Sequence, residues 1–131
     1  MVHIIYPTGV SHTECIRILV KNNSHIAARE CKGYFVLDIQ SERVCWTLPT
    51  ERPNATINVN DIEKLDFCAF PQGTRGDDTL ILPTEDGWDN LRRISLIEPV
   101  TNCKVRVTAE NAEMVEANVV ICRDEQRIEI K

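Results

Sequence analysis

The chain has 131 residues, a formal net charge of −5 and 43% hydrophobic residues. The length suits one ordinary domain, and the composition excludes collagen-like and disordered chains. The longest apolar runs span about four residues, against the roughly 20 of a membrane helix, and the acidic balance argues against a nucleic-acid partner.

Period-two alternation of apolar and polar residues predicts β-strands along most of the chain. In chain order we expect strands over 15–21, 31–40, 43–48, 56–59, 62–70, 79–82, 100–109, 117–121 and 127–130. The third is centred on Trp46. Residues 84–93 are the one stretch that could form a helix, because Thr84 can cap it and acidic residues fill its first turn.

Short strands separated by turns about every ten residues indicate an all-β protein, an antiparallel β-sandwich of about eight strands. We expect one domain over 1–131, with residues 1–11 as an N-terminal arm and residues 72–97 as a long loop insertion. The alternation assigns these residues to the core: Ile16, Ile18, Val20, Phe35, Leu37, Trp46, Leu65, Phe67, Val105, Val107, Val119 and Ile121.

The six cysteines lie at least about fourteen positions apart, so no close pair is present that could hold zinc. Three disulfides are one interpretation of an even number. Several of these cysteines lie on predicted core faces, where a thiol behaves as a small hydrophobic group. We therefore expect mainly buried thiols, no metal and no cofactor.

Several segments resemble immunoglobulin-like modules of the CARDB type, which are common in archaeal and bacterial proteins. The resemblance lies in the strand and turn over 16–23, in Ala27, Ala28 and Cys31 with the following Leu37-Asp38, in the turn and strand over 56–67, and in the strand over 105–112. It covers about two-thirds of the chain. The resemblance implies an immunoglobulin-like sandwich that binds a partner or acts as a spacer, and it implies no catalytic residues.

The loop insertion is the predicted binding region, because long polar loops on rigid scaffolds commonly carry binding. The candidate binding residues are Glu85, Asp86, Trp88, Asp89 and Arg92. Trp88 either presents a binding face or plugs the end of the sandwich. The acidic residues could offer calcium three or four oxygens, or they could be a solvated turn.

These observations predict a non-catalytic accessory or interaction module that binds another protein, another domain or a second copy of itself. The alternative is a carbohydrate- or calcium-binding module that uses residues 85–92. We expect no enzyme activity, no catalytic residue, no nucleic-acid partner, no membrane span and no small-molecule ligand. No signal peptide is evident, so we expect a cytoplasmic protein or a domain of a larger membrane-associated or exported protein.

Overall fold

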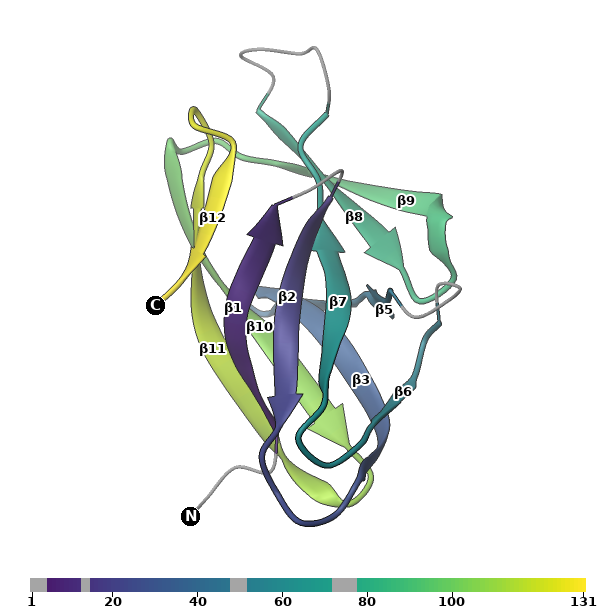
Figure 1. The fold of residues 1–131 in the computed structure, drawn as a ribbon. Helices are drawn as coiled ribbons and strands as arrows, with labels where there is room; N and C mark the ends of the chain where they lie inside the picture. The colour runs from purple at the N-terminus through teal and green to yellow at the C-terminus, as the bar shows by residue number, and fades with distance from the viewer. Residues whose placement is uncertain (1–4, 13–14, 48–51, 72–77) are drawn as a thin grey trace.

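The computed structural model describes residues 5–12, 15–47, 52–71 and 78–131. Over these residues the chain forms no helix, and hence no helix that could cross a membrane. It forms twelve strands (Figure 1): β1 (Ile5–His12), β2 (Ile16–Asn22), β3 (Ala28–Leu37), β4 (Gln40–Arg43), β5 (Cys45–Trp46), β6 (Ala55–Ile57), β7 (Ile62–Cys68), β8 (Thr79–Thr84), β9 (Gly87–Ser95), β10 (Val100–Ala109), β11 (Ala112–Cys122) and β12 (Arg127–Ile130). The predicted all-β, antiparallel class is confirmed, with twelve strands in place of about eight.

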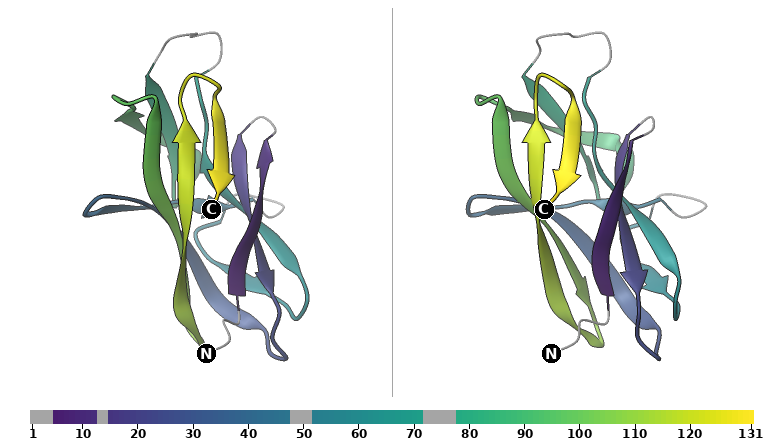
Figure 2. Two further views of the ribbon diagram at one scale, coloured as in Figure 1. Left: turned by 90° about the vertical axis from the view of Figure 1, so that its left-hand side faces the viewer. Right: turned by 60° about the vertical axis from the view of Figure 1, so that its left-hand side comes forward.

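Two antiparallel sheets form the body of the molecule. One has the strand order β1-β2-β7-β5, and the other follows the path β12-β11-β10-β3-β4, with β6 also pairing with β3. Figure 2 shows β10, β11 and β12 in one layer and β1, β2 and β7 in the other. Strands β8 and β9 form a separate hairpin, joined to the first sheet by a bridge between Ala69 and Ile81.

The core lies between the two layers and contains the residues that the alternation assigned to it. All the predicted core residues are buried except Leu37, which is half-buried and packs against the core. Gly33 on β3 allows the layers to approach closely. A Cβ atom on Gly33 would overlap the side chain of Leu65 on the opposite sheet.

Three boundaries differ from the prediction because pairing across the chain decides them. Residues 5–11 of the expected arm belong to β1, which pairs with β2, and Ile5 is fully buried. The strand expected over 43–48 is divided: β4 pairs with β3, and β5 pairs with β7 in the other sheet. The strand expected over 31–40 ends at Leu37, and a turn leaves Ile39 fully exposed.

The loop insertion expected over 72–97 is wrong for much of its length, and so is the helix over 84–93. The described part forms the β8–β9 hairpin, and residues 72–77 lie outside the described ranges. The chain reverses at Glu85 and Asp86, and Gly87 follows with a φ of 98°, which glycine adopts easily. Leu80, Leu82 and Ile94 then face the core from a strand pair.

Candidate functional site

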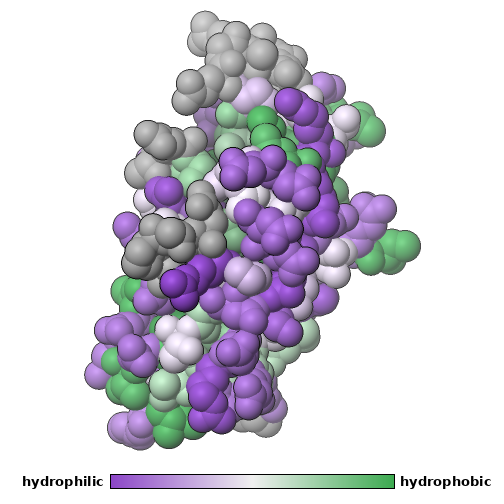
Figure 3. Space-filling view, turned by 90° about the vertical axis from the view of Figure 1, so that its right-hand side faces the viewer, coloured by the Kyte–Doolittle hydropathy of each residue, from purple (hydrophilic) through white to green (hydrophobic). Residues whose placement is uncertain are grey.

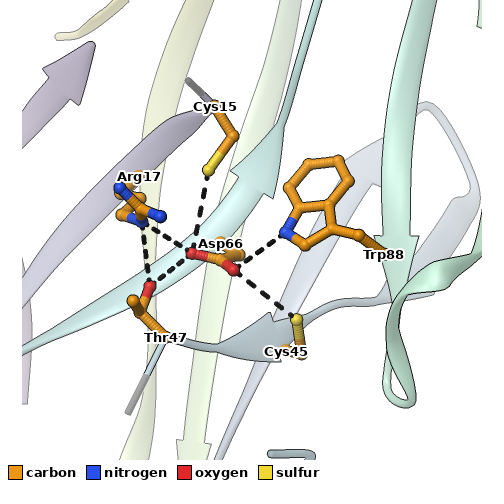
Figure 4. Close-up of polar contacts among 6 residues, drawn as sticks. All are labelled: Cys15, Arg17, Cys45, Thr47, Asp66 and Trp88. Atoms are coloured by element: carbon orange, nitrogen blue, oxygen red, sulfur yellow. Dashed lines mark hydrogen bonds and ion pairs between the residues drawn. The ribbon is translucent and has the colours of Figure 1, made fainter. Parts of the chain in front are cut away.

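Asp66 on β7 is the one charged side chain among the buried residues of the described ranges. Leu65 and Phe67 point into the core on either side of it, so Asp66 points to the outer face of its sheet. It is nevertheless only 2% exposed. A buried carboxylate is costly unless it is paired and hydrogen-bonded, and Figure 4 shows side chains from several elements around it.

The neighbouring strand supplies the opposite charge. Arg17 on β2 lies directly across from Asp66, and its Nε donates to Asp66 Oδ1 at 2.9 Å. The Thr47 hydroxyl, just after β5, donates to the same oxygen and accepts from Arg17 Nε at 3.1 Å. Two side chains, one on β2 and one just after β5, thus fix one carboxylate oxygen.

The hairpin supplies the donor to the second oxygen. Trp88 Nε1 on β9 donates to Asp66 Oδ2 at 2.9 Å. Leu82 pairs with Arg92 and Thr84 pairs with Gly87, so Pro83 alone lies opposite residues 88–91. Proline has no N–H to donate to the ladder. Residues 88–91 of β9 therefore form a bulge opposite Pro83, and a bulge redirects the side chains of its residues. This bulge turns Trp88 toward Asp66.

Two thiols complete the surroundings of the carboxylate. Cys15 Sγ lies 3.9 Å from Asp66 Oδ1, and Cys45 Sγ lies 4.0 Å from Asp66 Oδ2. We call these six residues the Asp66 clasp: Cys15, Arg17, Cys45, Thr47, Asp66 and Trp88. Donors from these elements contact both oxygens, so the carboxylate links β2, β5, β7 and β9.

All six cysteines are buried thiols. Burial raises the pKa of Cys31 to about 11 and that of Cys103 to about 12. Burial, followed by the nearby thiols of Cys103 and Cys15, raises the pKa of Cys68 as well. Because the thiolate is the reactive form, Cys31, Cys68 and Cys103 are weak nucleophiles at neutral pH.

The predicted binding residues do not converge on one site. Glu85 lies at the hairpin turn and pairs with Arg43 at 2.8 Å. Asp86 shares that turn, and its N–H donates to Thr84 Oγ1 at 3.3 Å. Arg92 pairs with Glu42 on β4 at 2.9 Å.

The other two candidates lie on the bulge of β9. Trp88 is half-buried and points into the clasp, while Asp89 is exposed. Trp88 therefore lies against the outer face of the four-stranded sheet and not at the end of the sandwich, where the plug interpretation placed it. Within the described ranges, no group of three or more histidine, cysteine, aspartate or glutamate side chains could hold a metal ion.

Sequence reasoning missed Asp66, Arg17 and Thr47. Alternation placed Asp66 correctly on the outer face of its strand, but an outer face is usually solvated. The available signal was a carboxylate inside the otherwise apolar run over 65–70, because a charge rarely occupies such a run without a partner. That signal could not have identified Trp88 as the group that covers it.

No family model matches the chain, and no curated protein or solved structure matches it either.

Proposed function

We propose that the chain is a non-catalytic, immunoglobulin-like interaction module that binds a protein partner by adding a strand at the outer edge of β9. The strand order supports the architectural part. The order β1-β2-β7-β5 corresponds to A-B-E-D of an immunoglobulin sandwich, and β3-β10-β11 corresponds to C-F-G. The β8–β9 hairpin is then an insertion between E and F. The CARDB-type resemblance belongs to this proposal, and an analogy of fold alone does not establish a function.

The observation that carries the functional part is the direction of the main-chain groups on β9. Ile81 exchanges both of its main-chain hydrogen bonds with Ala69, each at 2.8 Å, so its N–H and C=O point away from β9. Ile81 lies opposite Arg93. In an antiparallel pair of this kind, the N–H and C=O of Arg93 also point away from the partner strand, and those of Ser95 do the same.

These outward groups are accessible. Arg93 and Ser95 are exposed, and β9 pairs only with β8 within the described ranges. A strand edge of this kind can receive an extended segment, whose main chain then supplies the missing hydrogen bonds.

The other sheet edges are shorter or covered. Strands β4 and β5 have four and two residues. Strand β12 lies beside β1, and the N–H of Ile128 donates to Nε2 of His12 at 3.2 Å. His12 therefore occupies a main-chain donor that a partner strand would otherwise use.

The face seen in Figure 3 is mainly hydrophilic, with smaller apolar areas in its upper part and at its lower left. Main-chain hydrogen bonds at a strand edge suit such a surface as a source of affinity better than side-chain burial, which a large apolar patch would favour.

The test is a photo-crosslinking experiment in the native host. Ser95→p-benzoylphenylalanine places a reactive group at the edge, and the matched control carries the same group at Ile39, which is fully exposed on another turn. We expect a covalent protein adduct from position 95 and none from position 39. The adduct should disappear with Arg93→Pro, which removes an outward N–H and leaves the N–H groups of the β8–β9 ladder in place. Equal labelling at both positions, or no adduct at position 95, contradicts the proposal.

A further inference from the structure

The side chains beside the β9 edge point to a particular partner. Leu96 is buried and Ile94 packs against the core, whereas the odd-numbered residues from 91 to 97 face outward. Leu91 is 43% exposed and Ile97 is 80% exposed, and Arg93 and Ser95 lie between them. The exposed row therefore has an apolar residue at each end and polar residues in the middle.

This row is self-complementary about Ile94. We infer that the β9 edge pairs with the β9 edge of a second copy of the chain, antiparallel, around a two-fold axis at Ile94. This inference rests on the proposed strand addition at β9. In this register Arg93 lies opposite the partner's Ser95, and Leu91 lies opposite the partner's Ile97.

The register satisfies the outward main-chain groups. The main-chain N–H and C=O of Arg93 face those of the partner's Ser95, so the two residues exchange a pair of hydrogen bonds. The two-fold axis repeats that pair. At each end of the row, the exposed side chains of Leu91 and the partner's Ile97 cover each other. Cross-strand apolar pairs of this kind stabilise a sheet.

Two neighbouring symmetric registers are less favourable. An axis at Arg93 would set that residue directly opposite the partner's Arg93, and like charges facing each other destabilise a strand pair. An axis at Ser95 would set Arg93 opposite the partner's Ile97, so the apolar residues Leu91 and Ile97 would no longer cover each other.

The charges predict how salt affects the dimer. Each copy carries a net charge of −5, and the two Arg93 side chains lie on one diagonal of the paired face. The net charges of the two copies repel each other, and so do the two Arg93 side chains. Salt screens both repulsions, so added salt should strengthen self-association. An acidic partner segment held by Arg93 would instead dissociate as salt increases.

The experiment measures the association of the purified chain by sedimentation equilibrium, from micromolar to millimolar concentration and at low and high salt. We expect a concentration-dependent dimer that salt strengthens. Arg93→Pro removes one bond from each pair and should weaken association about 10-fold or more. Leu91→Lys should also weaken it, and the matched control Ile39→Lys should leave it unchanged.

Several outcomes would overturn the inference: a monomer at every concentration, a dimer indifferent to Arg93→Pro, or one weakened equally by Ile39→Lys. Crosslinking from position 95 separates this failure from that of the proposed function. An adduct with twice the mass of the chain supports the self-pairing. An adduct with a different protein overturns the self-pairing but supports strand addition, and the absence of any adduct contradicts both.

Discussion

The indole N–H of Trp88 donates to the carboxylate of Asp66 at 2.9 Å, across 22 positions of sequence. This bond joins the β8–β9 hairpin to the outer face of the four-stranded sheet. The position of the hairpin, and with it the position of the β9 edge, therefore depends on the buried charge of Asp66.

Trp88→Phe should destabilise the protein by about 1–3 kcal/mol, because Asp66 Oδ2 loses a donor while it stays buried. Urea unfolding measures the loss. The control is Leu91→Ala on the exposed face of the same strand, which should change stability by less than about 0.5 kcal/mol. Equal stability of Trp88→Phe and the parent would show that the bond does not hold the hairpin.

Arg17 and Asp66 should be energetically coupled. Arg17→Met leaves a carboxylate with 3% side-chain exposure without its cation, and should cost about 3 kcal/mol or more. Asp66→Asn removes the charge, so the double variant should be clearly more stable than the sum of the single losses predicts. A double-mutant cycle by urea unfolding gives the coupling.

The control for that cycle is the pair Arg123 and Asp124, in which the carboxylate side chain is 67% exposed. Its coupling should be near zero, since water screens a surface pair. Similar coupling in the two pairs would contradict the role given to burial.

Stability should fall at alkaline pH. The pKa of Cys31 is raised from 9.0 to about 11 and that of Cys103 from 9.0 to about 12 in the folded chain, chiefly by burial. The unfolded chain therefore loses these protons first as the pH increases. Between pH 9 and about 11, each thiol should remove about 1.4 kcal/mol per pH unit from the free energy of unfolding.

Urea unfolding from pH 7 to 11 checks this slope. Cys31→Ala should make the slope shallower by the contribution of one thiol, whatever its effect at pH 7. A slope that is the same in Cys31→Ala and the parent would mean that another group causes the alkaline loss.

Gly33→Ala should destabilise the protein by about 1–3 kcal/mol, because the new methyl group would overlap Leu65 across the core. Adding Leu65→Val to Gly33→Ala should recover part of that loss. The matched control is Gly9→Ala, where the new Cβ would lie 3.7 Å from Leu19 Cδ1, an ordinary contact. If both alanine variants lose the same stability, the backbone preference for a strand rather than packing is the cause.

The sequence by itself determined the fold class and most of the core. Strands β10 and β12 begin and end where alternation predicted, and Ile18, Leu65 and Val105 are buried as expected. The reason is local: one buried face of a strand imposes a period of two, and that period is visible without any knowledge of the partner strand.

Only the tertiary structure decided the role of residues 83–95 and of Asp66. The bulge opposite Pro83 interrupts the period of two, so a local pattern resembled a loop or a helix where the chain forms β9. Asp66 lies on a face that alternation assigns to solvent, and it is buried because Trp88 arrives from a distant strand. Such coverage is a property of three-dimensional packing, which no local pattern in the sequence encodes.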